Sequence, residues 1–397
     1  MTNNSISICF ATVCNNSENT IIQTLESVHT IISNCIIVDI GSTDDTCSLI
    51  DDFFKNKNIQ YQICNKEDKG ASNNKKELFD LCYDKNDFIL YLEPGEYLCT
   101  SHLLLLENIN VHFEKKHIAY FAYIHEDIPY IKIKNIEFNE SIIKTSIKKS
   151  VTARPVLFNN RYKWKIAGNV FHKYIPINVD ELDYGCISNN HFYINNQCNE
   201  NITNKEIIKS NIVLLKKDYL DTINVDAHGI NSLCIFHIAK HYYYLEEWNK
   251  ALLHFLKYTK LKDAEKDELF ESYVKIVEIM YILDYNIDDL IRYTACANEV
   301  CNERAEQYYH LGCIFNENAK YDLGYFCLKK AQSKDLGEIY KKPMKFINEF
   351  CYGKNINYQL ALSCLHSQRK DEGIELLNEL DISNNEIDFL KKRFNEI

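Results

Sequence analysis

The chain has 397 residues, of which 45 are Lys or Arg and 56 are Asp or Glu, so its formal net charge is −11. At about 100 to 200 residues per domain this length predicts two or three domains. The 46% hydrophobic and 25% charged content excludes a disordered chain, and the acidic balance argues against a broad surface for nucleic acid.

The 16 cysteines lie singly along the chain and form no Cys-x-x-Cys pair. In a chain of this length they are typical of reduced core thiols and not of a disulfide framework. No charged segment followed by an apolar one opens the chain, and no stretch approaches the roughly 18 apolar residues of a membrane span. We therefore expect a soluble, cytoplasmic protein without a membrane span.

The first hundred residues alternate short β-rich runs with amphipathic helical runs. The expected strands are 5–13, 35–39, 59–64 and 88–92, and the expected helices are 21–28, 47–54 and 71–82. This alternation predicts an α/β domain with a doubly wound parallel sheet. In such sheets ligands bind beyond the carboxyl ends of the strands, so the polar residues after each strand are the candidates for a site.

From residue 226 onward the pattern becomes helical, with an internal repeat. Ala239 and Gly312 lie 73 residues apart, and the same offset relates Ala251 to Gly324. These small positions are similar to the tetratricopeptide pattern, whose period is about 34 residues, with further units around 273–297 and 358–380. We predict a domain of residues 1–225 followed by an all-α repeat domain of residues 226–397; a plain helical bundle is the alternative. The first helices of the repeats could bind an acceptor or a second copy of the chain.

The clearest local signal for a site is the segment 37–46, where Asp39 closes a strand, Gly41 forms a turn and Asp44 can cap a helix. The Asp39 carboxylate could accept hydrogen bonds from a base or a ribose. Alternatively, it only satisfies backbone donors in its own turn.

Together with its neighbours, this segment resembles the family 2 glycosyltransferases, which have the nucleotide-diphospho-sugar-binding GT-A fold. The resemblance rests on Val-Asp-x-Gly-Ser-Thr-Asp-x-Thr at residues 38–46, and it continues in order through segments 68–74, 88–97, 154–158, 168–173 and 189–193. A helical repeat tail also follows the catalytic domain in one branch of this family. The composition, rich in Asn, Ile, Lys and Tyr, suggests an AT-rich genome such as that of a large DNA virus, which would place the protein in the host cytoplasm.

The resemblance implies a set of nucleotide-sugar-binding residues. They are Thr12, Asn16, Glu18, Asp39, Gly41, Asp68 and Asn74. Asp39 would contact uracil or ribose, and Asp68 would lie on the same side of the nucleotide.

The family's Asp-x-Asp element, which holds Mg²⁺ or Mn²⁺ against the diphosphate, is altered here. Glu93 replaces its first Asp, Gly95 replaces its second, and Glu96 follows. Glu93 and Glu96 could still hold a cation together. The family pattern also places a histidine at His191, which is a third candidate metal ligand.

The positions for the base and for a phosphate partner are altered too. Lys173 stands where the family has the Glu of its His-Glu segment, which is a candidate base for the acceptor hydroxyl. Substitute bases would be His172, Asp180 or Glu181. Asn73 stands where the family has an arginine, so that Arg154, Lys163 or Lys165 would have to bind the phosphates.

The function implied by the resemblance is an inverting glycosyltransferase that transfers a sugar from a UDP-sugar to a glycan or protein acceptor, which the helical repeat recruits. The alternative is a catalytically degenerate scaffold that retains binding of a nucleotide-sugar or a partner. A nucleotidyltransferase is disfavoured because no Gly-rich, basic phosphate loop follows the first strand.

Overall fold

The computed structural model describes residues 6–55, 57–99, 116–129, 147–179, 182–187, 193–196, 204–222, 229–380 and 392. The chain divides into two compact units. The first comprises Met1–Asp127, Val151–Asn231 and Lys341–Pro343, and the second comprises Ile128–Ser150, Ser232–Tyr340 and Met344–Ile397.

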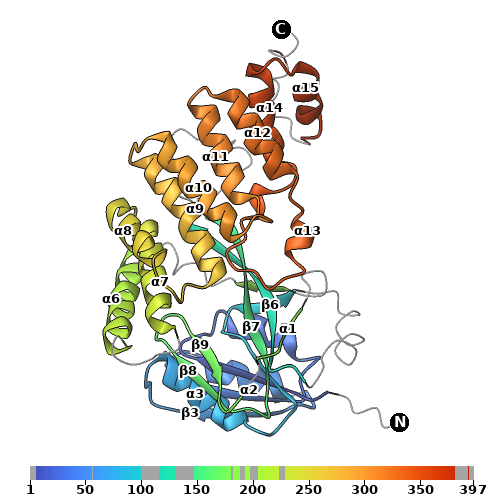
Figure 1. Ribbon diagram of the computed structural model, residues 1–397. Coiled ribbons are helices and arrows are strands. Elements are labelled where there is room, and N and C mark those ends of the chain that lie inside the picture. The colour runs from blue at the N-terminus through green and yellow to red at the C-terminus, as the bar shows by residue number, and fades with distance from the viewer. Residues whose placement is uncertain are drawn as a thin grey trace. The chain divides into compact units, whose positions relative to one another are not determined.

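The first unit begins with the predicted alternation of strands and helices. The elements are β1 (Ile8–Cys14), α1 (Ile21–Val28), β2 (Asn34–Asp39), α2 (Thr46–Lys55), β3 (Gln60–Asn65), α3 (Ala71–Cys82) and β4 (Phe88–Tyr91). These strands, which lie in the blue part of Figure 1, pair in parallel in the order β3-β2-β1-β4. The predicted parallel pairing of these four strands is therefore confirmed. Because β2 and β3 lie on one side of β1 and β4 lies on the other, the gap between β1 and β4 is the topological switch point.

Further strands extend this sheet beyond β4 and make it mixed. They are β5 (Glu96–Cys99), β6 (Ala119–Pro129), β7 (Ile147–Asn159), β10 (Tyr184–Cys186) and β11 (Tyr193–Asn196). β7 pairs antiparallel with β4, and β5 pairs antiparallel with β11, whereas β10 and β11 are parallel to β6. A separate antiparallel hairpin is formed by β8 (Trp164–Ala167) and β9 (Lys173–Pro176).

The parallel strands β1, β2 and β4 are buried on both faces, which explains why they are nearly continuous apolar runs in the sequence, whereas the edge strand β3 is partly exposed. In β1, Phe10 belongs to the cluster of core residues that includes α1 and α2. Its neighbours Cys9 and Ala11 belong to the cluster that includes α3. Side chains alternate across a strand, so one strand supplies both cores.

Helices account for nearly all regular structure described after β11. They are α6 (Lys205–Thr222), α7 (Ile230–Tyr244), α8 (Trp248–Tyr258), α9 (Lys266–Ile282), α10 (Ile287–Val300), α11 (Glu306–Glu317), α12 (Tyr321–Gln332), α13 (Leu336–Ile339), the 3₁₀ helix η1 (Glu349–Cys351), α14 (Asn355–His366) and α15 (Lys370–Asn378). The described chain is thus helical after β11, and its first helix there, α6, begins at Lys205, before residue 226, where the sequence predicts the change.

Four helical hairpins, α7–α8, α9–α10, α11–α12 and α14–α15, share one turn geometry. Their connections contain Glu246, Asp284, Ala319 and Gln368, each with φ between 54° and 59°. In the α11–α12 turn, the N–H of Lys320 donates to the carbonyl of Phe315 at 2.8 Å. This bond across six residues, with a left-handed residue inside it, is the Schellman ending of a helix. Glu246 and Ala319 are separated by the 73 residues that the sequence repeat predicts.

Two glycines of the repeat allow α11 and α12 to pack closely. A Cβ on Gly312 would lie 2.6 Å from a side-chain carbon of Leu328, and a Cβ on Gly324 would lie 2.3 Å from Oδ1 of Asn316. A larger side chain at either position would force the helices apart. The small residues predicted from the sequence repeat thus lie where the two helices of the hairpin are in contact.

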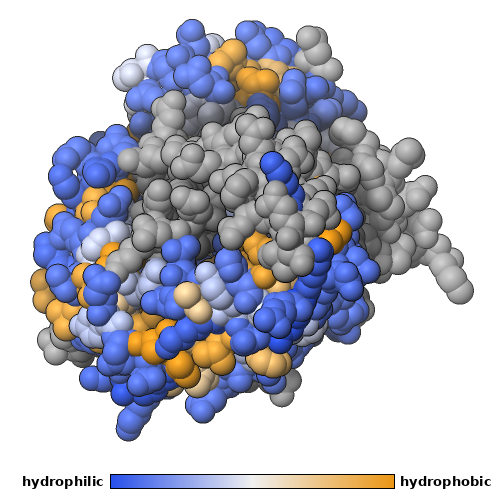
Figure 2. Space-filling view, turned by 90° about the horizontal axis from the view of Figure 1, so that it is seen from above, coloured by the Kyte–Doolittle hydropathy of each residue, from blue (hydrophilic) through white to orange (hydrophobic). Residues whose placement is uncertain are grey.

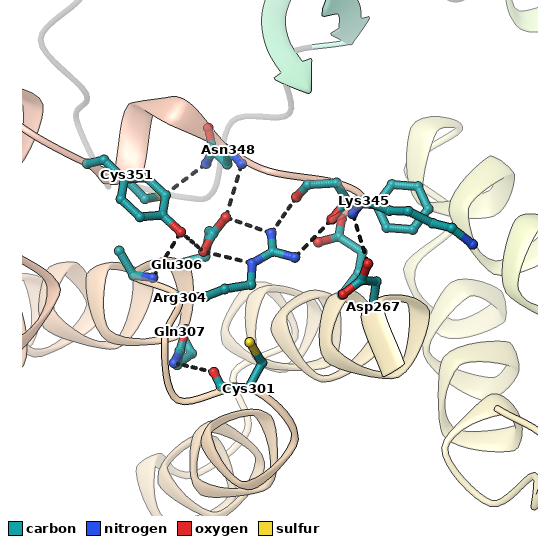
Figure 3. Close-up of polar contacts among 12 residues, drawn as sticks. Asp267, Cys301, Arg304, Glu306, Gln307, Lys345, Asn348 and Cys351 are labelled. Carbon is teal, nitrogen blue, oxygen red and sulfur yellow. Dashed lines mark hydrogen bonds and ion pairs between the residues drawn. The ribbon is translucent and has the colours of Figure 1, made fainter. Parts of the chain in front are cut away.

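A segment between α13 and α14, here called the strap (residues 344–352), is bound to the first helices of the hairpins. Arg304, which is fully buried, donates to the carbonyl oxygens of Lys345 at 2.9 Å and Phe346 at 2.6 Å. Figure 3 shows this guanidinium between the strap and the Glu306 carboxylate, which accepts from it at 2.6 and 3.2 Å. The Phe346 ring lies 5.2 Å from that of Phe236 on α7. The strap therefore covers part of the surface that the sequence assigns to a partner.

Surface and thiol properties agree with the composition. Hydrophilic residues predominate on the face shown in Figure 2, and hydrophobic ones form smaller groups among them. Within the described ranges, no helix has the length and apolar character needed to cross a membrane. The cysteines of the described part are free, and each of them is buried or half-buried.

Candidate functional site at the carboxyl edge of the sheet

The loops after β1 and β2 are bonded to each other at the carboxyl edge of the sheet. Asn16 Oδ1 accepts from the N–H of Thr43 at 2.8 Å, and Glu18 Oε2 accepts from the N–H of Asp45 at 3.1 Å. In return, the N–H of Glu18 donates to Asp44 Oδ2 at 3.1 Å. Reciprocal side-chain and backbone bonds of this kind fix the loops before a ligand arrives. Asn16 and Glu18, predicted as nucleotide-binding residues, thus have structural partners on the next loop.

Asp39 is buried at the end of β2 and accepts hydrogen bonds from its own turn. Its Oδ2 accepts from the N–H groups of Gly41 at 3.1 Å and Ser42 at 3.0 Å. Its Oδ1 accepts from the Ser42 hydroxyl and, more weakly, from Cys14 Sγ at 3.6 Å. The turn requires φ of +91° at Gly41, which only glycine adopts without strain. Asp39 therefore accepts from backbone donors of its own turn, which is the structural role that the sequence left open. Its contact with a base or a ribose stays a prediction.

Asp68 shapes the start of α3. Its Oδ1 accepts from the N–H of Gly70 at 2.8 Å and from Asn74 Nδ2 at 2.7 Å, and these bonds lower the pKa of the carboxyl. Asn74 also accepts from the N–H of Lys69 at 2.9 Å. Asp68 and Asn74, predicted separately, therefore form one bonded pair.

Thr12 lies inside β1 and not in the loop after it. It is fully buried, and its hydroxyl oxygen has no hydrogen-bond partner in the structure. Its predicted contact with a nucleotide stays a prediction.

The turn between β4 and β5 carries Glu93 and Glu96, which the sequence analysis predicted as metal ligands. The N–H of Glu93 donates to Glu96 Oε2 at 2.8 Å, which closes the turn. Gly95 within it is buried with φ of +93°, and its N–H donates to Thr24 on α1 at 2.9 Å. An aspartate at Gly95 would be strained in this left-handed conformation. The backbone of this turn therefore favours glycine at position 95.

A buried lysine and a half-buried arginine contact the two glutamates of this turn. Lys75 Nζ lies 2.6 Å from Glu93 Oε1, and Arg154 from β7 pairs with Glu96. The pKa of Glu93 is lowered to about 2, mainly by Lys75, so this carboxyl is ionised at neutral pH. Burial raises the pKa of Glu96, against the opposing effect of Arg154. The result is a compact group of two cations and two carboxyls beside the switch point.

His172 lies close enough to this group to respond to its charges. Its Nδ1 is 2.8 Å from the carbonyl oxygen of Gly168. Because a carbonyl only accepts, Nδ1 must carry the proton, and Nε2 is left with its lone pair. Burial, and next the charge of Lys75, lower the pKa of His172 to about 4, so the ring is neutral at pH 7.

Three predicted residues lie outside the described residues: Asp180, Glu181 and His191. Conversely, the sequence reasoning did not single out Lys75. Lys75 was detectable in principle, because it occupies the buried face of α3 with Leu78, Phe79 and Cys82. A lysine at an apolar position of a helix requires an anionic partner.

A divalent cation does not fit Glu93 and Glu96 as they stand. Each carboxylate already contacts a cation, and a metal ion between them would lie beside Lys75 and Arg154. Among the residues that the structure describes, no group of three or more His, Cys, Asp or Glu side chains could hold a metal ion.

The fold defines a mixed α/β protein with a set of helical hairpins. The candidate site lies at the carboxyl edge of its parallel strands, where sheets of this kind bind ligands. No family model and no curated protein matches the chain. Among solved structures it is similar to S. aureus TarS 1–349 in complex with UDP-GlcNAc, at 11% identity, a TM-score of 0.31 and 92% coverage of each chain. It is also similar to MamA, at 16% identity and a TM-score of 0.32, over 48% of this chain and 89% of that one. A thermophilic TPR protein of Thermus thermophilus is similar at 13% identity and a TM-score of 0.30, over 48% of this chain and 90% of that one. Similarity at these TM-scores defines neither a family nor a function.

Proposed function

We propose that the chain is an inverting glycosyltransferase of the GT-A, family 2 type, in which residues 1–225 bind a UDP-sugar and residues 226–397 recruit a glycan or protein acceptor. The observation that carries the proposal is the position of the motif residues. Asn16, Asp39 and Glu93 follow three adjacent parallel strands, two of which border the switch point of the sheet. Doubly wound sheets bind ligands at this edge.

On the nucleotide side, the bonded loops after β1 and β2 provide a preformed surface. Asp39 can take part because a carboxylate has about four acceptor positions. Besides the Ser42 and backbone donors, its donors include two thiols, Cys14 at 3.6 Å and Cys47. A donor on uracil or ribose would replace such a bond at little cost, since a thiol is a poor donor.

On the acceptor side, His172 is the described candidate base. In the proposed step, the acceptor oxygen forms a bond to the anomeric carbon as the bond to the diphosphate breaks, and UDP leaves with that electron pair. Nε2 takes the hydroxyl proton. A base with a pKa of about 4 is weak, but Lys75 and Arg154 contribute to that depression. A diphosphate bound to these cations would offset their charge and raise the pKa of His172 toward its usual value. Asp180 and Glu181 are the other proposed bases.

The helical hairpins are proposed to recruit the acceptor through their first helices. The strap contacts α7, α9 and α11 through Phe346, Lys345 and Asn348. An acceptor that approaches these helices therefore meets the strap as part of the surface.

The test is UDP release from a panel of UDP-sugars, together with calorimetric binding of UDP. We expect turnover in the wild type and a loss of at least tenfold in kcat for His172→Gln with unchanged UDP affinity. His29→Gln is the matched control, because the His29 ring nitrogen also bonds to a backbone carbonyl, at 2.9 Å, away from the charged group. Absence of both UDP binding and UDP release would contradict the proposed function.

The second candidate function is a binding or scaffold protein that no longer transfers sugar. It is favoured by one observation, namely that both glutamates of the altered motif are paired with cations. UDP binding without any release of UDP from UDP-sugars would support this second candidate over the first.

A further inference from the structure

We infer that Lys75 and Arg154 bind the diphosphate of the donor without a divalent cation, and that Glu93 occupies the phosphate position on Lys75 until the donor displaces it. This inference rests on the proposed function, since it concerns the same ligand. It reverses the expected role of Glu93, from a metal ligand to a competitor of the phosphate.

Lys75 has the features of an anion-binding residue. Its side chain is only 7% exposed, and its Nζ lies 2.6 Å from Glu93 Oε1 and 5.1 Å from the centroid of the Tyr91 ring. A buried ammonium group is costly unless an anion compensates it. Lys75 therefore needs a negative partner, and either a carboxylate or a phosphate can fill this role.

Glu93 is the partner that can leave. Its side chain is 50% exposed, although its carboxylate bonds to a buried lysine. Rotation of this side chain would return the carboxylate to water, whereas Lys75 has no comparable route to solvent. A phosphate oxygen can then take the position of Glu93 Oε1 and keep the charge of Lys75 compensated.

Arg154 supplies the second cation, and its own partner does not leave. Glu96 has a side chain that is 6% exposed, and it binds both Arg154 and the N–H of Glu93. The guanidinium has five N–H donors in a planar array, so a phosphate can bind to it beside Glu96.

The charges of the group favour an anion once Glu93 has moved. Lys75 and Arg154 then face the ligand with only Glu96 to offset them, which leaves a net charge of about +1. A divalent cation at Glu93 and Glu96 would instead add positive charge beside two cations. The described residues around this turn thus supply the counter-charge that the family obtains from a metal ion.

The first test compares UDP with uridine by titration calorimetry in the presence of EDTA. We expect UDP to bind to the wild type and Lys75→Met to weaken UDP binding at least tenfold, with uridine binding unchanged. Lys76→Met is the matched control: it removes the same charge from the next residue of α3, whose side chain is exposed, and should leave both affinities unchanged.

The second test uses Glu93→Gln, which keeps the shape of the side chain and removes its charge. We expect UDP affinity in EDTA to rise severalfold, because the competitor for Lys75 is weakened. If Glu93 were a metal ligand, the substitution would instead lower the affinity for UDP in the presence of Mn²⁺. This variant keeps the inference testable even if Lys75→Met does not fold.

The outcomes separate the inference from the proposed function. UDP binding that requires Mn²⁺ or Mg²⁺ would overturn the inference and leave the glycosyltransferase proposal intact. Failure of UDP to bind with or without metal would overturn both.

Discussion

The N–H of Glu93 donates to the carboxylate of Glu96 at 2.8 Å, so the two residues expected to share a metal ion are instead parts of one turn. Glu96 is buried and also pairs with Arg154. Its bonds therefore hold the end of β4, the start of β5 and β7 together. A structural role of this kind predicts an effect on stability and not only on ligand binding.

We expect Glu96→Ala to lower the free energy of unfolding by about 3 kcal/mol, because removing one partner leaves the mostly buried Arg154 charge uncompensated. Glu96→Gln should cost less, since an amide oxygen can still accept from the N–H of Glu93. Urea denaturation measures both. Wild-type stability in Glu96→Ala would show that the carboxylate does not support the turn.

The Arg304 side chain should be essential to the helical unit. Its guanidinium is fully buried and binds Glu306 and two carbonyls of the strap. Arg304→Met leaves the Glu306 charge buried without its partner, and we expect a loss of about 3 to 5 kcal/mol in the free energy of unfolding.

Two comparisons test this account of Arg304. The double variant Arg304→Met with Glu306→Gln should recover part of the loss, because the unpaired charge is gone. The control Arg292→Met removes an arginine that is 64% exposed and pairs with Asp289, and it should change stability by less than about 0.5 kcal/mol. Equal losses of unfolding free energy in Arg304→Met and Arg292→Met would contradict the stabilising role of the buried Arg304.

The stability of the helical unit should fall below neutral pH because of a buried histidine. Burial lowers the pKa of His241 from 6.5 to about 4. A group with a depressed folded-state pKa contributes stability that is complete above its unfolded pKa and is lost as the pH falls toward the folded value.

Between pH 7 and pH 5 we expect His241 to account for a loss of about 2 kcal/mol. His237, whose pKa is also lowered by burial and then by Lys240, adds to the same trend. Guanidinium denaturation at both pH values measures the loss, and His241→Gln should flatten the pH dependence. If the unfolding free energy of His241→Gln depended on pH as strongly as that of the wild type, other groups would be responsible for the effect.

The left-handed turn of the α11–α12 hairpin predicts a stabilising substitution. Ala319 has φ of +54°, a conformation that is costly for a residue with a Cβ. Ala319→Gly should raise the free energy of unfolding by about 0.5 to 1 kcal/mol. Ala331→Gly, within α12, should lower it by about 1 kcal/mol or more. Thermal denaturation measures both changes. A loss of stability in Ala319→Gly would contradict the claim that the backbone is strained at Ala319.

The order of strands and helices up to β4 could be predicted because each element there has a local signal. Buried apolar runs mark β1, β2 and β4, and the stripe of Leu78, Phe79 and Cys82 marks α3. The antiparallel strands β5, β7 and β11 were not predicted, since their pairing depends on residues far apart in the sequence, such as Tyr193 with Cys99.

The sequence by itself determined where chemistry could occur: the glycine turn at Gly41, the acidic positions after the strands and the small positions of the repeat all follow from short-range backbone requirements. Only the tertiary structure decided which charges meet. Lys75 on α3 and Arg154 on β7 are remote in sequence from the turn that they contact, and burial turns these ordinary side chains into strong electrostatic partners of Glu93 and Glu96. Pairing across such separations depends on the packing of the whole sheet, which no local pattern records.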